Sequence, residues 1–286
     1  MKPAPVLAFL PDALVEPIVR AALAEDLGRA GDITSAACLD ADLRFSASFV
    51  ARGAGVVAGL ACARLAIRVL DPDAQVELLL GDGEAAAAGA PLARVEANAR
   101  ALLSAERVAL NLLGRLSGVA TLTRAFVNAV AGTGAAIADT RKTTPGLRAL
   151  EKYAVRCGGG VNHRFGLDDA ILIKDNHVAA CGGLGAAIRR ARAAAGHLVS
   201  VEAEVDSLAQ LDEALAAGPD VIMLDNFRLE DLARAVAHAG GRVALEASGG
   251  VGLGNVRAIA ETGIDVISVG ALTHSAAALD IGLDGA

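Results

Sequence analysis

The feature that most constrains the fold is a repeated alternation of short apolar runs and amphipathic helical stretches in the second half of the chain. Six apolar runs occur after about residue 135, at 135–138, 171–173, 199–205, 221–224, 243–245 and 266–269. Between them, segments such as 207–217 and 229–239 place leucine or valine on one helical face. Because parallel strands need a crossover connection, a strand–helix–strand repeat predicts a parallel β-sheet.

Polar residues and one glycine follow these apolar runs, where each predicted strand ends. In chain order they are Asp139, Lys174, Glu204, Asp225, Ser248 and Gly270, and the last four lie 21, 23 and 22 residues apart. In a βα-barrel the carboxyl ends of all strands face one mouth, so residues at these ends converge. An open doubly wound sheet gathers fewer strand ends at one place. We therefore predict an α/β barrel with a binding site at its mouth.

The first hundred residues have a different pattern, typical of a mixed α/β module. Residues 44–49 alternate polar and apolar side chains, which predicts a half-buried strand, and Asp82-Gly83 predicts a turn. Residues 98–118 have helical periodicity and a polar stripe, which consists of Arg100, Ser104, Arg107, Asn111 and Arg115. The simplest interpretation of this stripe is a solvated face. With 286 residues, the chain can form one large barrel or a barrel with a smaller companion domain.

The charge balance argues against some classes of partner. The net charge is −7, and one Tyr with six Phe offers few platforms for base stacking. We therefore expect binding to neither nucleic acid nor a membrane surface. If the substrate is anionic, its positive partners must be concentrated in one part of the chain.

The sequence also predicts a cytoplasmic protein. The uncharged stretch 125–138 holds 14 residues, fewer than the roughly 20 that span a bilayer, and the apolar stretch 6–10 is too short for a secretory signal. Cys38, Cys62, Cys157 and Cys181 are scattered without a C-x-x-C pair, so we expect reduced thiols. A nucleophilic role for Cys157 lacks a nearby base in the sequence, and simple packing is the favoured interpretation.

Residues 139–177 contain the concentrated positive charge. Two histidines, His163 and His177, and seven cationic side chains stand here against five acids; the cations are Arg141, Lys142, Arg148, Lys152, Arg156, Arg164 and Lys174. Arginine forks and mobile lysines together suit a ligand with several anionic groups. Surface ion pairing is the alternative, and we expect it for Lys152 with Glu151. Arg141, Lys142 and Lys174 instead adjoin apolar strands, where an unpaired charge is costly.

Glycine-rich turns indicate where phosphate groups could bind. Gly158-Gly159-Gly160 precedes Asn162-His163-Arg164, and Ser248-Gly249-Gly250 follows a strand and precedes a helix that we expect to begin at Asn255. Small residues let backbone N–H groups and a helix N-terminus approach a phosphate. The next strand ends in residues 270–275, and the last two strands of a barrel commonly bind phosphate.

Glu204 and Asp225 provide two carboxylates at adjacent strand ends. This pair suits Mg²⁺ held partly by the protein and partly by a pyrophosphate. It equally suits ribose hydroxyls, a developing positive sugar carbon, or the acid and base of a glycosidase. The dense cationic cluster makes the glycosidase less favoured, because a neutral sugar has no need of it.

Four motifs carry a family resemblance: residues 139–148, 151–156, 162–164 and 173–177. They resemble quinolinate phosphoribosyltransferase, the decarboxylating nicotinate-nucleotide pyrophosphorylase family of NAD biosynthesis. The resemblance extends from residues 25–34 to residues 279–284 and so covers nearly the whole chain.

The resemblance implies a fold and an activity. The fold is an incomplete TIM-like α/β barrel over residues 116–275 with a smaller N-terminal α/β sandwich domain over residues 1–115, to which 276–286 is a candidate addition. The reaction converts quinolinate and phosphoribosyl pyrophosphate to nicotinate mononucleotide, pyrophosphate and CO₂ with Mg²⁺. Family members work as homodimers or higher assemblies with shared sites.

The resemblance also implies roles for individual residues. Thr140, Arg141, Lys142, His163, Arg164 and Lys174 would line the quinolinate pocket, and Arg107 would enter it from the partner subunit. Glu204 and Asp225 would face the ribose and the metal. The phosphate region would comprise Ser248, Gly249, Gly250, Val269, Gly270, Ala271 and His274. Lys142, Lys174, Glu204 and Asp225 are the expected catalytic residues.

Two rival functions are compatible with these sequence features. A related pyrophosphorylase acting on nicotinate would need fewer cations than this cluster provides. A catalytically silent barrel that senses a phosphorylated metabolite would be favoured by loss of Lys174, Glu204 or Asp225, and all three are present.

Overall fold

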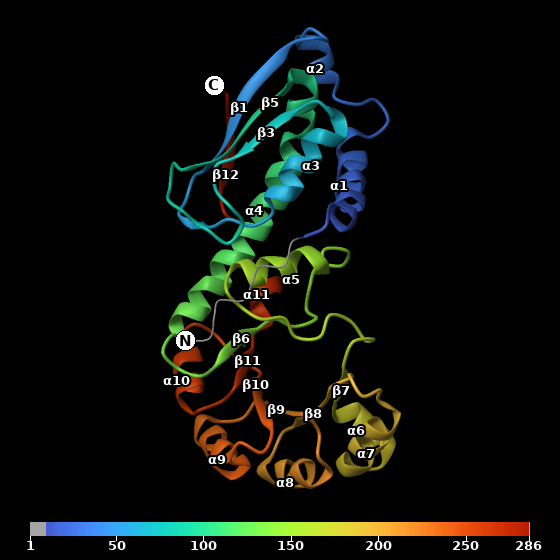
Figure 1. Ribbon diagram of the computed structural model, residues 1–286, viewed down its shortest axis with the longest axis vertical. Coiled ribbons are helices and arrows are strands. Elements are labelled where there is room, and N and C mark those ends of the chain that lie inside the picture. The colour runs from blue at the N-terminus through green and yellow to red at the C-terminus, as the bar shows by residue number, and fades with distance from the viewer. Residues whose placement is uncertain (1–9, 286) are drawn as a thin grey trace. The chain divides into compact units, whose positions relative to one another are not determined.

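The structure, a computed structural model, describes residues 10–285 (Figure 1), so most of the apolar stretch 6–10 lies outside the described residues. The chain forms two compact units. Unit 1 comprises the residues up to Arg124, Thr143–Gly159 and the residues from Leu272 onward. Unit 2 comprises Ala125–Lys142 and Gly160–Ala271. The chain therefore passes between the units four times.

Unit 2 is built on a six-stranded parallel sheet. Its strands are β6 (Ala136–Ala138), β7 (Ile171–Ile173), β8 (Val201–Val205), β9 (Val221–Asp225), β10 (Ala244–Ser248) and β11 (Val266–Ser268). The spatial order is β7-β8-β9-β10-β11-β6, so the strands follow the chain from β7 to β11 and β6 lies beyond β11. Within the described residues β6 and β7 do not pair, and the barrel is incomplete.

Helices connect the successive strands of unit 2. They are α6 (Asp175–Cys181), α7 (Leu184–Ala194), α8 (Leu208–Ala217), α9 (Leu229–Ala239) and α10 (Val256–Glu261). Figure 1 shows α7, α8 and α9 side by side on the outer side of the strands. Ser207 caps α8 by accepting a hydrogen bond from the Gln210 N–H at 3.4 Å, and Gly218 ends it with a φ of 71°.

Unit 1 contains an antiparallel sheet of order β12-β1-β5-β3 and a small β2–β4 pair. The strands are β1 (Arg44–Ala51), β2 (Gly55–Val56), β3 (Gln75–Leu78), β4 (Ala85–Ala86), β5 (Pro91–Asn98) and β12 (Ile281–Gly285). Its helices are α1 (Asp12–Leu27), α2 (Ile33–Cys38), α3 (Leu60–Leu70) and α5 (Arg148–Cys157). The predicted fold class, an incomplete α/β barrel with a smaller α/β domain, is confirmed.

Helix α4 (Ala99–Ala129) is longer than the predicted segment 98–118, and its polar stripe is not simply a solvated face. The Arg100 guanidinium donates to the Leu39 carbonyl oxygen, and the Ser104 hydroxyl donates to Asp32 at 3.1 Å. Arg107 and Asn111 alone in the stripe are exposed. Close packing continues at Gly118, where a Cβ atom would lie 2.0 Å from the carbonyl oxygen of Ala277.

The expected surface ion pair between Lys152 and Glu151 was wrong. Both side chains are buried, with Glu151 0% exposed and Lys152 2% exposed. The Glu151 carboxylate instead pairs with Arg115 at 2.9 Å and accepts hydrogen bonds from the Thr144 N–H at 3.0 Å and hydroxyl at 2.8 Å. Arg115 also donates to the carbonyl oxygens of Ala276 and Thr273. Helix α5 therefore belongs to the core of unit 1.

Two smaller expectations concern the thiols and the membrane. Cys38, Cys62, Cys157 and Cys181 are free thiols, as predicted. Over residues 10–285, every helix is too short or too polar to cross a bilayer.

Candidate active site

A cavity of about 620 Å³ in unit 2 opens where the strands end. Eleven residues that the sequence placed in a site line it: Thr140, Arg141, Lys142, His163, Arg164, Lys174, Glu204, Asp225, Ser248, Gly249 and Gly250. All come from unit 2. Of the six strand-end residues predicted to converge, Lys174, Glu204, Asp225 and Ser248 line this cavity, whereas Asp139 and Gly270 do not.

Four further residues of the lining were not predicted: Leu172, Met223, Asn226 and Ser268. Leu172 on β7 and Met223 on β9 lie two residues before Lys174 and Asp225, so they share a face with these charged residues. This period of two in each strand is a signal that the sequence did contain.

Two guanidinium groups create a strongly cationic part of the cavity. The pKa of Arg164 is lowered, first by burial and then by the charge of Arg141, while Glu202 raises it. Arg164 donates from Nη1 to the Ala170 carbonyl oxygen at 3.1 Å, but its buried Nε has no hydrogen-bond partner among the described residues. Like charges in a partly dry cavity favour an anion that neutralises them.

A lysine and two carboxylates occupy the adjoining part of the cavity. Lys174 Nζ lies 2.6 Å from Glu204 Oε2, and Asp225 accepts a hydrogen bond from the Asn226 amide at 2.7 Å. Each carboxylate uses one oxygen in these contacts. Its second oxygen could therefore bind a cation. His177, in contrast, caps α6 by accepting from the Lys174 N–H at 3.0 Å.

A buried aspartate, Asp139, holds the segment 162–164 in place by hydrogen bonds. Asp139 is 0% exposed and accepts hydrogen bonds from the Asn162 amide at 2.6 Å and from the His163 N–H at 2.9 Å. Asp139 therefore acts as an anchor for the residues that line the cavity.

Two carboxylates that the sequence analysis missed lie in the interior of the barrel. Glu202 on β8 and Glu246 on β10 are buried, and His163 Nε2 lies 2.9 Å from Glu202 and 3.7 Å from Glu246. Burial and, second, the neighbouring Glu202 raise the pKa of Glu246 to about 7. Acidic residues inside apolar strands at 201–205 and 244–248 were the signal that could have identified them.

The loops after β9 and β10 pack tightly at the cavity. Gly249 has a φ of 90°, and a Cβ atom there would lie 2.1 Å from Asn226 Oδ1, so only glycine fits. The helix expected to begin at Asn255 begins at Val256 and has only six residues. Asn255 is its N-cap, so the predicted start differs by one residue, and a phosphate role for this helix N-terminus stays a prediction.

Three predicted phosphate residues are not part of the cavity lining. Val269 is buried and donates its N–H to the Ala138 carbonyl oxygen at 2.9 Å, so it joins β11 to β6. Gly270 and Ala271 follow it, and Ala271 begins α11 (Ala271–His274). A phosphate role for these three residues stays a prediction.

Arg107 and His274 belong to unit 1, whereas the cavity belongs to unit 2. Arg107 is exposed on α4 and lines a different pocket of about 390 Å³ in unit 1. His274 is exposed at the end of α11, with its Nδ1 2.6 Å from the Ser275 hydroxyl. Their proposed contacts with substrates stay predictions.

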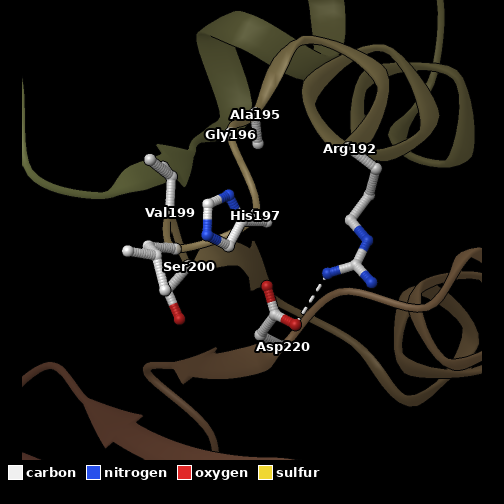
Figure 2. A pocket seen from close by; sticks show the side chains of 8 residues that line it. Arg192, Ala195, Gly196, His197, Val199, Ser200 and Asp220 are labelled. Atoms are coloured by element: carbon white, nitrogen blue, oxygen red, sulfur yellow. Dashed lines mark hydrogen bonds and ion pairs between the residues drawn. The ribbon is translucent and has the colours of Figure 1, made fainter.

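A second cavity of unit 2, of about 330 Å³, lies among residues that precede β8 and β9 (Figure 2). Its charged groups are already paired, because Arg192 contacts Asp220 at 2.6 Å and Asp220 also accepts from the Val201 N–H at 2.8 Å. The Val201 hydrogen bond and then Arg192 lower the pKa of Asp220. Residues at the amino ends of barrel strands usually serve stability rather than catalysis.

Cys157 does not have the properties of a nucleophile. It is 2% exposed, and burial raises the pKa of its thiol to about 12. The thiolate, which is the reactive form, is therefore absent at neutral pH.

Comparisons with known proteins identify relatives of nearly the whole chain. The family "Quinolinate phosphoribosyl transferase, C-terminal domain" matches residues 119–284, and its N-terminal domain matches residues 32–117. The nicotinate-nucleotide pyrophosphorylase (carboxylating) of Mycobacterium leprae (strain TN) is 52% identical over 271 residues, covering 93% of this chain and 95% of that protein. The probable enzyme of the same name from Bacillus subtilis (strain 168) is 47% identical over 260 residues, covering 91% and 89%. A solved structure of the nicotinate-nucleotide pyrophosphorylase from Francisella tularensis has a TM-score of 0.94 at 41% identity, covering 98% of this chain and 99% of that one.

Proposed function

The chain belongs to the quinolinate phosphoribosyltransferase family, and on this premise we propose that it joins quinolinate to the ribose of phosphoribosyl pyrophosphate. The products are nicotinate mononucleotide, pyrophosphate and CO₂, and the reaction supplies NAD biosynthesis. The enzyme is a pentosyltransferase.

The observation that carries this proposal is the juxtaposition of Arg141 and Arg164 in the cavity. The charge of Arg141 lowers the pKa of Arg164, and the buried Nε of Arg164 has no hydrogen-bond partner among the described residues. A ligand with two carboxylates supplies both the countercharge and the missing acceptor. Quinolinate has two adjacent carboxylates, whereas nicotinate has one.

The donor and its metal fit the other side of the cavity. Glu204 and Asp225 offer oxygen ligands at the ends of neighbouring strands β8 and β9, and hard oxygen donors suit Mg²⁺. These two residues would hold Mg²⁺ together with the pyrophosphate of the donor. Bound there, the ion would neutralise negative charge on the leaving pyrophosphate.

The transfer then depends on positioning and electrostatics. The bond from ribose C1 to the pyrophosphate oxygen breaks with its electron pair going to pyrophosphate, and the pyridine nitrogen lone pair forms the new bond to C1. Arg141 and Arg164 orient the pyridine, and Lys142 and Lys174 meet negative charge on the phosphates. The carboxylate of Glu204 or Asp225 favours the positive charge that develops on the ribose.

Loss of CO₂ follows from the charge on the new pyridinium. The bond from C2 to its carboxylate breaks, CO₂ leaves, and the electron pair remains on C2 beside the positive nitrogen. A proton then adds to C2. Arg141 and Arg164 would favour this step by keeping the ring oriented.

The assembly and the location extend the same proposal. We expect a homodimer or a higher homo-oligomer in which Arg107 of one subunit reaches the cavity of another, and a cytoplasmic enzyme. Support comes from the exposure of Arg107 on α4, which leaves this cation accessible to another subunit.

The decisive experiment supplies the purified protein with phosphoribosyl pyrophosphate and either quinolinate or nicotinate, with and without Mg²⁺. Nicotinate mononucleotide and CO₂ should form from quinolinate only, and only with the metal ion. Product from nicotinate alone would overturn the substrate assignment, and full activity after removal of divalent ions would overturn the role of Mg²⁺.

A further inference from the structure

The barrel interior beneath the cavity contains two carboxylates that the proposed reaction does not use. Glu202 is 7% exposed and Glu246 is 4% exposed, and neither lines the cavity. They lie two residues before Glu204 and Ser248, so they point to the same face as these residues but one layer deeper. Acidic side chains are rarely buried in such a layer unless they have a partner.

Their common partner is His163. Its Nε2 lies 2.9 Å from Glu202 Oε2, while the same nitrogen lies 3.7 Å from Glu246 Oε1. The other ring nitrogen, Nδ1, accepts a hydrogen bond from the Arg164 N–H at 2.7 Å. Since Nδ1 accepts, the ring proton is on Nε2 and is donated to Glu202.

This arrangement is poorly suited to a metal ion. Ligand atoms of His163, Glu202 and Glu246 lie within 4.8 Å of one another, a spacing that could hold a cation. Coordination by Nε2 would require that nitrogen to lose its proton while Nδ1 is still accepting from the backbone. A neutral imidazole cannot have both nitrogens unprotonated, so the cluster favours a hydrogen bond over a cation.

The histidine also connects the buried layer to the cavity. Its backbone N–H is held by Asp139 at 2.9 Å, its ring is held by Glu202, and its Nδ1 orients the peptide that begins Arg164. Arg164 in turn lines the cavity. A shift of the ring would therefore move the guanidinium that binds substrate in the proposed function.

From these contacts we infer that Glu202, together with Glu246, is a positioning residue for the part of the cavity where Arg141 and Arg164 would bind the two carboxylates of quinolinate. It fixes the tautomer and the orientation of His163 and, through His163, sets the place of Arg164. His163 then contributes shape and not charge to the quinolinate pocket that it is expected to line. The effect on quinolinate binding rests on the proposed function, whereas the tautomer and the orientation of His163 do not depend on it.

The test compares three substitutions of Glu202. Glu202→Gln keeps a carbonyl oxygen that accepts from Nε2, so it should behave nearly as the wild type. Glu202→Asp keeps the charge but moves the acceptor away from Nε2, and Glu202→Ala removes both the charge and the acceptor. Each of these two variants should raise the KM for quinolinate about 10-fold or more, which is the effect expected from losing a hydrogen bond to a charged group. The KM for phosphoribosyl pyrophosphate should change little, and Glu230→Gln on the exposed start of α9 is the control.

Steady-state kinetics and thermal melting decide between position and mere stability. If Glu202→Asp equals the wild type, or if Glu202→Gln is as impaired as Glu202→Ala, the inference is wrong. If kcat falls and the KM values for both substrates rise together with a lower melting temperature, Glu202 has a purely structural role and the inference is wrong.

A readout without substrate separates this inference from the proposed function. In ¹⁵N-histidine NMR spectra, the signals that vanish in His163→Asn should report a protonated Nε2 and an unprotonated Nδ1, and these signals should persist in Glu202→Gln. His177, whose Nδ1 accepts from the Lys174 N–H, should show the same tautomer in every variant. The opposite tautomer of His163, or a stoichiometric shift of its signals on adding Zn²⁺ or Mg²⁺, would overturn the inference. Absence of turnover with quinolinate would instead contradict the proposed function and leave the tautomer result intact.

Discussion

Lys142 lies at the exposed rim of the cavity, and its N–H is held by the Thr140 hydroxyl at 3.0 Å. Removing one cation that meets developing charge lowers the rate by about 10²–10³, by analogy with the donors of an oxyanion hole. We therefore expect Lys142→Ala to lower kcat by this factor and to leave the fold intact. Steady-state assays of nicotinate mononucleotide formation measure it. Arg234→Ala, which removes an exposed cation from α9, is the matched control, and equal activities of the two variants would exclude Lys142 from the reaction.

Glu246 should make the stability of the protein depend on pH. Burial and Glu202 raise the pKa of Glu246 to about 7, from 4.5 for an ordinary glutamate. Between these two values the unfolded chain ionises this carboxyl more readily than the folded protein, so rising pH destabilises the fold, and the penalty is complete above about pH 7. Glu246→Gln cannot ionise, and its free energy of unfolding should exceed that of the wild type by up to ~3 kcal/mol at pH 8. Urea unfolding at pH 5 and pH 8 measures the difference, which should shrink toward the lower pH; a difference independent of pH contradicts the prediction.

The cationic residues of the site were readable in the sequence, whereas for the buried acids the sequence showed only their place inside apolar strands and not their partner. Arg141, Lys142 and Lys174 follow apolar runs directly, and strand ends converge in a barrel whatever the partners are. Glu202 and Glu246 lie inside apolar strands, and their partner His163 comes from a distant segment. Only the three-dimensional contacts show that a charge in such a place has a partner.

At the scale of the elements, the pair of Glu151 on α5 and Arg115 on α4 should be a main support of unit 1. Removal of one partner leaves an uncompensated buried charge, so Glu151→Ala should lower the free energy of unfolding by about 3–5 kcal/mol. The exposed pair of Glu16 and Arg20 on α1 offers the comparison, and Glu16→Ala should cost less than about 1 kcal/mol. Chemical unfolding of both variants measures these costs, and equal costs would show that burial does not strengthen the first pair.

The same contrast explains which elements the sequence predicted. Helix α9 occupies the predicted range 229–239, because its apolar residues recur with helical spacing. Helix α5 was missed, since Glu151 and Lys152 in its middle read as surface residues. The partner of the buried Glu151 is Arg115, 36 positions earlier, and no local pattern contains that information.

At the scale of the whole molecule, Arg107 provides a test of the expected assembly. If one subunit lends Arg107 to the cavity of another, Arg107→Ala and Lys174→Ala should each be inactive alone. Mixed dimers of the two variants should regain part of the activity, because one of their two sites contains both native residues. Assays after joint unfolding and refolding measure the recovery. A mixture that stays inactive, although native gels show mixed dimers, would argue against a shared site.

The division into two units was the least predictable feature of the chain. The spacing of apolar runs distinguishes the first hundred residues from the rest of the chain. It does not show that Thr143–Gly159 and the residues from Leu272 onward belong to unit 1. Those segments are joined to unit 1 by contacts such as Tyr153 with Asp82 at 2.8 Å. Side chains so distant in the chain leave no mark on local periodicity.

The pairing of β12 with β1 has a consequence for biosynthesis. Arg52, just after β1, and Asp284 on β12 are hydrogen-bonded although they are 232 positions apart, so the two strands leave the ribosome at widely separated times. During translation the edge of β1 is without this neighbour, and an open edge can recruit strands from other nascent chains. A holdase chaperone that covers the early sheet would protect folding in this interval, and a chain shortened before Ile281 would keep the hazard permanently.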